Sequence, residues 1–429
     1  MSNRYKESNR LIKKALDVIP LGSQTFSKSI TQFPRGVSPL FIERGKGSHV
    51  WDVDENEYID FINGLCSVTI GYSDSDIDYA IKRQLDSGIS FSLPHRLEMD
   101  VAQIIVDMVP GGDMVRFGKN GTDVTSAAIR LSRAYTGRDH VAVCGYHGWQ
   151  DWYIGITTKN LGVPKEVSNL THVFEYNNIE SLKKIFESNK DTVAAVIMEP
   201  MNIEWPKDDF LHEVKNIVKF YGSVLIFDEN ITGFRYANGG AQELFGVVPD
   251  LSTFGKGLGN GCPISAIVGN RKIMKGMKDI FFSSTFGGET ISLSAAKAVL
   301  NKIKNDGVVD KLSKIGTSVI LGFNRAVNKY KLESILDIKG HPSWSIVIFK
   351  DSATYNGLQI KTFIMQEMFK RGILFTGSHN ISFSHTKEDI EKLMTVYDEV
   401  FDILSMSIQN GTLENLLEVD PIQQLFSIR

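Results

Sequence analysis

A lysine that could act as a nucleophile stands between small residues in the segment DLSTFGKGLGNGCPISAIVG (250–269). Lys256 follows an apolar stretch and precedes a glycine-rich turn, so its side chain can reach inward and form a Schiff base with a carbonyl compound. Burial and nearby cations would lower the pKa of the amine and free it for that attack. The alternative is a solvated surface lysine, the usual place for a single lysine of this kind.

A carboxylate follows a predicted buried strand in GSVLIFDENITGFR (222–235). Val224–Phe227 is continuously apolar, and Asp228 comes at its carboxyl end, where an unpaired charge would be costly. A protonated pyridine nitrogen is one good partner, because an ion pair to this nitrogen keeps the ring cationic and able to accept electrons. A helix cap or a salt bridge to Arg235 explains the same carboxylate equally well.

Three further segments contain groups that could hold a phosphorylated, planar ligand. Asn120–Gly121–Thr122 forms a turn that leads into a predicted helix, and a helix N-terminus with a nearby hydroxyl stabilises a phosphate. Tyr146, between glycines in CGYHG (144–148), could stack on a planar ring. The loop STFGGE (284–289) supplies hydroxyls that could bind phosphate oxygens. Each segment also has an ordinary structural interpretation: a helix cap, core packing and a connecting loop, respectively.

These residues need elements that bring them to one edge of a sheet. From about residue 100 the chain alternates short apolar runs with amphipathic segments, a pattern typical of a mostly parallel sheet with helices on both faces. Ligands of such sheets bind beyond the carboxyl ends of the strands. The predicted strands are Met114–Phe117, Val141–Gly145, Val193–Met198, Val224–Phe227 and Ile264–Val268, and the predicted helices include Val124–Tyr135, Leu211–Tyr221 and Ile291–Leu300.

The two ends of the chain have a different pattern. Residues 49–64 alternate apolar and polar side chains and predict short antiparallel strands joined by a tight turn. In the last hundred residues Ile346–Phe349 and Ile381–Ser384 predict strands, and Lys387–Ser405 predicts a helix with Thr386 as its N-cap. We therefore expect a second, smaller α+β unit, which the N-terminal residues join.

Composition places the chain among soluble globular proteins, with 429 residues, 42% hydrophobic and 23% charged, and a net charge of −3. There is no long basic stripe, so nucleic acid is not an expected partner. There is no apolar N-terminal run and no stretch of roughly eighteen apolar residues, so neither a secretory signal nor a membrane span is expected. Cys66, Cys144 and Cys262 lack metal-binding spacing and fit free thiols in a cytoplasmic protein, and no metal is expected. GKGLGNG lacks the spacing of a Walker P-loop, which disfavours an NTPase.

In combination, FDE…TGFR and TFGKGLGNGCPISAIVG resemble the class III aminotransferases, which have fold type I and depend on pyridoxal 5′-phosphate (PLP). The resemblance extends from GKGSHVWDVDENEYIDF (45–61) to SFSHTKEDIEKL (382–393), and it is greatest for the branch related to glutamate-1-semialdehyde 2,1-aminomutase. It implies an α/β fold with a large, mostly parallel-sheet domain at residues 66–310. It also implies a smaller α+β domain formed by residues 311–429 and the N-terminal segment 1–65, and a homodimer with active sites at the subunit interface.

The resemblance further implies a role for each candidate residue. Lys256 would form the Schiff base with PLP and later transfer protons, Asp228 would pair with the pyridine nitrogen, and Tyr146 would stack on the ring. Gly121–Thr122 would bind the phosphate at the helix start, and Thr285 would reach the phosphate held by the neighbouring subunit. The remaining expected cofactor contacts are Asn120, His147, Glu199 and Asn230.

Departures from the family pattern bear on the activity. Asn230 stands where the family usually has valine or isoleucine against the ring, KNGTD replaces the commoner NSGTE, and STFGGE replaces the usual SGNP or SGHP loop. The tail GILFTGSHNISFSHT (372–386) lacks the longer, glutamate-containing insertion expected of the aminomutases. We therefore expect an aminotransferase that moves an amino group from an amino acid to a small carbonyl acceptor, such as a sugar or sugar precursor. An intramolecular aminomutase is the alternative.

Five polar residues lie in segments that would border the entrance to such a site: Arg35, His95, Arg96, Glu289 and His379. Surface or structural roles explain these residues equally well. A non-catalytic binding or regulatory protein with the same fold is a third interpretation of the chain, and the presence of both Lys256 and Asp228 disfavours it.

Overall fold

The structure, a computed structural model, describes residues 3–423. Within this range the chain forms two compact units. The large unit contains residues 66–68 and 75–309, and the small unit contains residues 3–65, 69–74 and 310–423. None of the described helices has the length and apolar character needed to cross a bilayer.

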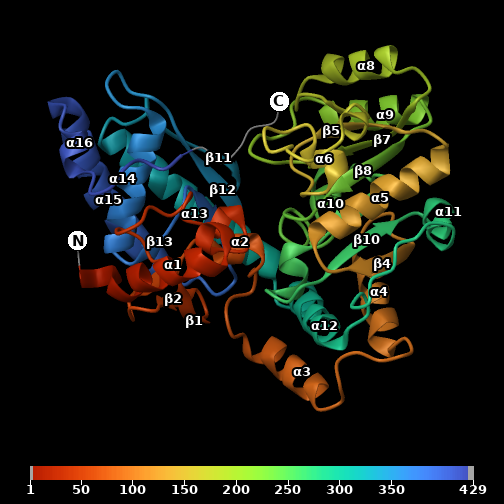
Figure 1. The fold of residues 1–429 in the computed structure, drawn as a ribbon, viewed down its shortest axis with the longest axis horizontal. Coiled ribbons are helices and arrows are strands. Elements are labelled where there is room, and N and C mark those ends of the chain that lie inside the picture. The colour runs from red at the N-terminus through yellow and green to blue at the C-terminus, as the bar shows by residue number, and fades with distance from the viewer. Residues whose placement is uncertain (1–2, 424–429) are drawn as a thin grey trace. The chain divides into compact units, whose positions relative to one another are not determined.

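A seven-stranded sheet forms the centre of the large unit, in the order β4-β10-β9-β8-β7-β5-β6 (Figure 1). Its strands are β4 (Met114–Gly118), β5 (His140–Cys144), β6 (Thr171–Val173), β7 (Val193–Met198), β8 (Val224–Asp228), β9 (Leu251–Phe254) and β10 (Ser265–Gly269). The pairs from β9 to β6 are parallel, and β10 is antiparallel to both β9 and β4. β4 therefore points the same way as the parallel strands, and its carboxyl end lies at the same edge of the sheet.

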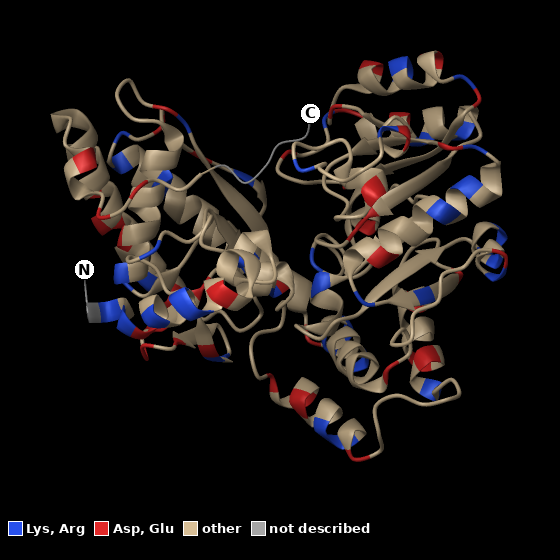
Figure 2. Cartoon of the chain, viewed as in Figure 1, with Lys and Arg blue, Asp and Glu red and all other residues tan. Residues whose placement is uncertain are grey.

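Helices cover both faces of this sheet because successive residues of a strand point to opposite sides. The helices of the large unit are α3 (Ser75–Leu85), α4 (Arg96–Met108), α5 (Gly121–Thr136), α6 (Asp151–Ile154), α7 (Lys165–Ser168), α8 (Ile179–Ser188), α9 (Phe210–Phe220), α10 (Ala241–Phe245), α11 (Arg271–Met274) and α12 (Thr290–Asn305). Val141 and Val143 of β5 belong to the core that contains α5, whereas Ala142 belongs to the core that contains α8 and α9. Exposed helices have both acidic and basic residues, and on α3 the acidic residues lie in the first turn and the basic residues in the last turn (Figure 2).

The small unit contains two sheets, and residues from distant parts of the chain share one of its cores. One sheet has the order β1-β2-β3-β13, with β13 parallel to β3, and the other, β11-β12-β14, is antiparallel. Tyr5, Val50 and Tyr58 pack with Met365 and Phe369. The strands are β1 (Ile42–Lys46), β2 (His49–Asp52), β3 (Glu57–Asp60), β11 (Leu336–His341), β12 (Trp344–Phe349), β13 (Ile373–Leu374) and β14 (Ser378–Asn380). The helices are α1 (Lys6–Val18), α14 (Gly357–Lys370), α15 (Lys387–Asn410) and α16 (Leu413–Leu416), and α2 (Asn63–Cys66) and α13 (Val308–Lys329) contain residues of both units.

The predicted strands of the large sheet lie within one residue of the observed ones at each end, and Thr386 caps α15 as expected. One predicted strand, Ile381–Ser384, is wrong. The paired strand ends at Asn380, and the backbone then turns, with Ser382 N donating to His385 Nδ1 at 3.0 Å. The strands β6 and β9 were absent from the sequence prediction.

Candidate active site

The carboxyl ends of four parallel strands position the candidate residues of the large unit. Asp228 is the last residue of β8, and Glu199 directly follows β7. Tyr146 and His147 follow β5, and Lys256 follows β9 after a single glycine. Parallel strands end at one edge of the sheet, which is where ligands of open α/β sheets bind. The helix α5 starts beyond the same edge, after β4.

The Asp228 carboxylate is buried and accepts hydrogen bonds on both oxygens. His147 Nδ1 lies 2.8 Å from Oδ2, and because an ionised carboxylate only accepts, Nδ1 carries the proton. Oδ1 accepts from the backbone N and the side-chain Nδ2 of Asn230, at 3.1 and 2.6 Å, and from Thr253 Oγ1 at 3.3 Å. Burial raises the pKa of Asp228, but the His147 hydrogen bond and the positive charge of Lys256 oppose it, and the net pKa is below its ordinary value. Asp228 is therefore an ionised buried group that suits a cationic partner.

A second buried carboxyl group, Glu199, has the opposite electrostatic character. Burial raises the pKa of Glu199, and the negative charge of Asp228 raises it further. Its Oε2 accepts hydrogen bonds from Tyr146 N at 3.1 Å and from Asn202 Nδ2 at 2.7 Å. Neighbouring carboxyl groups whose pKa values are pushed apart are typical of active sites, where one holds a proton and the other stays charged.

The ring of His147 is buried, and its orientation is set by its neighbours. It lies almost parallel to Trp152, with 6.4 Å between ring centroids and 12° between planes. Nδ1 donates a hydrogen bond to Asp228, whereas Nε2 is buried and has no hydrogen-bond partner among residues 3–423. A buried histidine nitrogen without a hydrogen-bond partner lowers the stability of the fold. Proteins tolerate such a loss at functional sites, where the other ring nitrogen makes a specific contact.

Tyr146 is the exposed aromatic residue of this site. Its ring meets Tyr153 edge to face at 5.6 Å between centroids, and Tyr153 is itself held by a hydrogen bond from its hydroxyl to Gly145 O at 2.7 Å. Tyr146 is 47% exposed, so it is not the core-packing residue that was the alternative interpretation. An aromatic ring fixed at its edge can offer a face to a planar ligand.

The first turn of α5 forms a cradle of donors. The amides of Gly121 and Thr122 lie in the turn where a helix has no internal acceptors for its N–H groups. Thr122 Oγ1 is buried and accepts from Trp149 N at 3.3 Å, so its own proton is available to a ligand. The chain approaches closely at Gly148, which has a φ of +109°, and a Cβ there would lie 2.6 Å from the Thr122 Cβ. Asn120, by contrast, has an exposed side chain, and its carbonyl accepts from Ser265 Oγ at 2.8 Å.

Lys256 has an unusual backbone conformation and a partly buried side chain. Its φ is +39°, in the left-handed region that favours glycine, and it starts a 3₁₀ turn, Lys256–Gly259. Its charge is close enough to lower the pKa of both Asp228 and Glu199. The solvated surface lysine that was the alternative interpretation does not describe this position.

Thr285, also predicted to contact the cofactor, makes no hydrogen bond to the other candidate residues among those that the structure describes. It lies in an exposed turn before α12, and within the described residues no hydrogen bond joins it to Lys256 or Asp228. Its expected ligand belongs to a neighbouring copy of the chain. Close to this turn Glu289 caps α12 and pairs with Lys119 Nζ at 2.6 Å, which ties the loop to the strand β4 end.

The residues expected to border the entrance cap a helix, form an ion pair, lie exposed to solvent or lie in the core. His95 is the N-cap of α4, Arg96 is paired with Asp100 at 3.7 Å, and Arg35 is exposed. His379 is fully buried in the small unit, where burial lowers its pKa to about 3 and keeps its ring neutral. It is therefore a core histidine.

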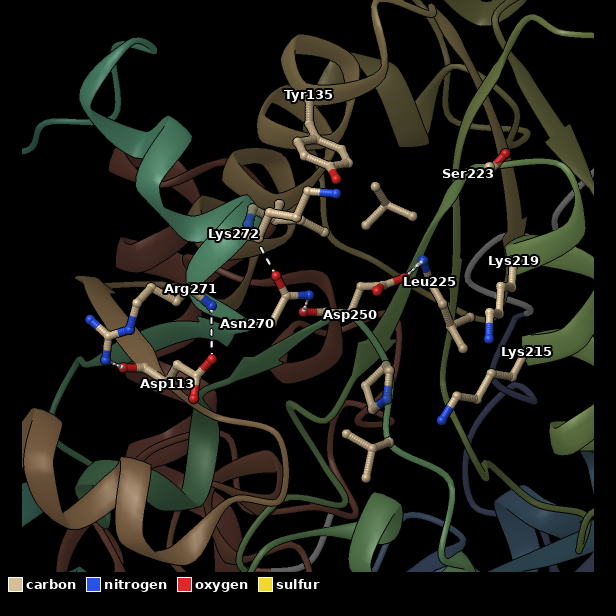
Figure 3. A pocket seen from close by; sticks show the side chains of 15 residues that line it. Asp113, Tyr135, Lys215, Lys219, Ser223, Leu225, Asp250, Asn270, Arg271 and Lys272 are labelled. Atoms are coloured by element: carbon tan, nitrogen blue, oxygen red, sulfur yellow. Dashed lines mark hydrogen bonds between the residues drawn. The ribbon is translucent and has the colours of Figure 1, made fainter.

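Two residues that sequence reasoning missed contact the buried carboxyl groups: Thr253 donates to Asp228, and Asn202 donates to Glu199. Neither has a local signal, because each is recognised only once the neighbouring strands are in register. A cavity of about 650 Å³ lies elsewhere, at the amino ends of β8 and β9, with Asp250, Lys215 and Lys272 in its lining (Figure 3). This is the opposite edge of the sheet, so the cavity is separate from the candidate site.

The sequence profile of the family described as Aminotransferase class-III matches residues 32–401. The chain belongs to this family. It is therefore an enzyme of the PLP-dependent class III aminotransferases, as the sequence predicts, and PLP is its cofactor. The residues present fit that cofactor, since a buried ionised carboxylate, an exposed aromatic ring, a helix start and a lysine come together at one sheet edge.

Relatives with two kinds of name are similar to this chain. It is 34% identical over 399 residues to a 3-aminobutyryl-CoA aminotransferase of Cloacimonas acidaminovorans, covering 90% of this chain and 94% of the relative. It is also 34% identical over 394 residues to a glutamate-1-semialdehyde 2,1-aminomutase of Persephonella marina, covering 85% and 92%. The FumI protein of Sphingopyxis sp. MTA144, solved in its PLP internal aldimine form, has a TM-score of 0.88 at 27% identity and covers 98% and 99%. The predicted fold type I is confirmed.

Proposed function

We propose that this enzyme transfers an amino group from an amino-acid donor to a small carbonyl acceptor, with Lys256 as the residue that binds the cofactor. The observation that supports this proposal is the buried pair of Asp228 and His147, with the partly buried Lys256, at one sheet edge, and with Asp228 kept ionised. Sugar carbonyls and sugar precursors are included among the acceptors. The printed names of the relatives include an aminotransferase that is 34% identical over most of the chain.

The residues divide the work of this reaction. Bound PLP supplies an aldehyde carbon and an electron-accepting ring. Lys256 Nζ would hold the cofactor at that carbon and, when its amine is free, would take a proton from the donor Cα. Asp228, oriented by His147, would keep a proton on the ring nitrogen, and Tyr146 would lie against the ring.

The phosphate would be held by the helix start and by a second copy of the chain. The amides of Gly121 and Thr122 and the Thr122 hydroxyl would donate to it, and Thr285 would reach the phosphate of the neighbouring subunit. We propose a homodimer with active sites at its interface. Its supporting observation is a set of large exposed hydrophobic side chains at the end of α3, in the connection from α3 to α4 and in the segment before α12: Leu85, Ile89, Phe91, Leu93, Phe281 and Phe286. Size-exclusion chromatography with light scattering tests it, and a monomer would contradict it.

The proposal includes two further expectations. We place the domain limits after residues 65 and 310. We also propose a cytoplasmic location, which is supported by three cysteines that are all free thiols.

The alternative activity is an intramolecular aminomutase, which is supported by the aminomutase names among the relatives.

The test is a scan of amino donors and carbonyl acceptors, read from conversion of bound PLP to pyridoxamine phosphate. An aminotransferase stalls after the first half-reaction without an acceptor, whereas an aminomutase turns over without one. Lys256→Ala should lose both the visible absorbance of the lysine-bound cofactor and turnover. Asp228→Ala should keep some PLP and lose most turnover, and near-normal turnover would place the partner of the ring nitrogen elsewhere.

A further inference from the structure

Asn230 has a contact that an apolar residue at this position would not make. Its side-chain Nδ2 lies 2.6 Å from Asp228 Oδ1, the shortest of the three hydrogen bonds that this oxygen accepts. The assignment of the amide is fixed by chemistry, because an ionised carboxylate can only accept and the nitrogen must face it. Asn230 is thus one of two side chains, with His147, that hold Asp228 by short hydrogen bonds, one on each oxygen.

The carbonyl oxygen of the Asn230 amide packs closely against two glycines. A Cβ on Gly121 would lie 2.7 Å from Asn230 Oδ1, and a Cβ on Gly255 would collide with the same atom. Oδ1 is buried and, in the described chain, has no hydrogen-bond partner. An unsatisfied buried acceptor is destabilising, so the orientation of the amide is set by an interaction of its other end. Within these contacts that interaction is the hydrogen bond from Nδ2 to Asp228.

The position of Asn230 connects three parts of the site. It follows Asp228 by two residues, lies against the first residue of α5, and lies against the glycine that precedes Lys256. No exchange of the amide nitrogen and oxygen is possible without placing an oxygen against the carboxylate. The side chain is therefore held in one rotamer and one orientation, ready to act on Asp228 before any ligand arrives.

We infer that Asn230 is a positioning residue that keeps Asp228 ionised and turned toward the cofactor, so that the ring nitrogen of PLP, and not the carboxylate, carries the shared proton. This inference rests on the proposed roles of Asp228 and Lys256. Each donor removed from a carboxylate makes it a stronger base, and a stronger base draws the proton away from the pyridine. A pyridine without its proton is a weaker acceptor of electrons.

Several other titratable groups act on the same carboxylate and stay in place when Asn230 is changed. They are His147 on Oδ2, Lys256, Glu199, Tyr146 and Tyr153. Thr253 offers a matched comparison, since it donates to the same Oδ1 at a longer distance, 3.3 Å.

The first test uses the apo protein and does not depend on activity. The carboxyl signal of Asp228, assigned by its loss in Asp228→Asn, is titrated by NMR with ¹³C-labelled aspartate. Asn230→Val should raise the pKa of Asp228 by about one to two units, the size expected for one hydrogen bond to a charged acceptor. Asn230→Asp, which keeps the shape but adds a like charge, should raise it at least as far, and Thr253→Val should raise it less. An unchanged pKa in both Asn230 variants overturns the inference.

The second test follows the proton on the cofactor. With ¹⁵N-labelled PLP, the ring-nitrogen signal of the parent protein should have the shift of a protonated pyridine, and that of Asn230→Val should move toward the neutral value. The ratio of protonated to neutral nitrogen should fall about 10- to 100-fold, which is the same pKa change expressed as populations. If the ring-nitrogen signal does not move in Asn230→Val or in Asn230→Asp, the inference that Asn230 keeps the proton on the ring nitrogen is overturned. A parent protein that takes up no PLP overturns the proposed function itself, whereas the apo titration still reports on Asp228 alone.

Discussion

The hydrogen bond between His147 and Asp228 predicts a measurable loss when the imidazole is replaced. His147→Phe keeps an aromatic ring beside Trp152 and removes the donor. Neither side chain of the pair is more than 4% exposed, so water does not replace the donor. A hydrogen bond to a charged acceptor contributes about 1.5–3 kcal/mol, and for a unit of this size the melting temperature of the full-length apo protein at pH 7 should fall by about 3–10 °C.

The sign of the pH dependence follows from the depressed pKa of Asp228. Its contribution to stability is present above the unfolded-state pKa of a carboxyl group and is lost as the pH falls through the folded-state pKa. In His147→Phe the carboxyl pKa is higher, so the deficit is constant at neutral pH and narrows on acidification.

Differential scanning calorimetry at several pH values measures both quantities. His147→Asn is the matched control, because its amide can donate from nearly the same place as Nδ1 and should recover most of the loss. A His147→Phe protein that melts within about 1 °C of the parent at pH 7, or a deficit that grows toward acid, would refute the reasoning.

Two other predictions concern a close approach and a charge pair. Gly148→Ala would push a methyl group onto Thr122 and should weaken PLP binding in a spectrophotometric titration, whereas Gly137→Ala, at a positive φ with open space around it, should cost stability and leave PLP affinity unchanged. In the small unit, burial raises the pKa of Asp389 but its hydrogen bond with His49, 2.9 Å long, holds it well below the ordinary value, and the pKa of His49 is raised in turn. Asp389→Asn should therefore lower the melting temperature most between the ordinary carboxyl pKa and the ordinary histidine pKa. The deficit should shrink as the pH falls through the lowered pKa of Asp389 and as it rises through the raised pKa of His49.

Continuous apolar runs were the part of the fold that sequence reasoning could predict. β7 has the predicted bounds because each of its residues is buried, and the end of the apolar run in β8 marks where Asp228 begins the site. The next strand, β9, was missed because Ser252 and Thr253 interrupt its apolar pattern. Both hydroxyls are buried and satisfied, by Gln242 and Asp228, which only the folded register reveals.

The candidate residues of the site can be picked out in the sequence, but the contacts between them cannot. Lys256, Asp228 and Tyr146 are each visible in a local motif, yet the partner of Asp228 is His147, 81 residues earlier in the chain. Such a pairing depends on which strands are neighbours in the sheet, and spacing along the chain does not contain that information. The same holds for Asn230. The sequence shows that a polar residue stands where the family usually has an apolar one, but it does not show that this residue contacts Asp228.

The left-handed backbone of Lys256 places stability and reactivity in opposition at one position. A non-glycine residue in this conformation stores roughly 1–3 kcal/mol of strain, which glycine would release. The chain would therefore be more stable with glycine at position 256, but it would then lack the amine that we propose binds PLP. Variants selected only for heat resistance should drift toward that inert form, so a thermostable version of this enzyme has to gain its stability at other positions.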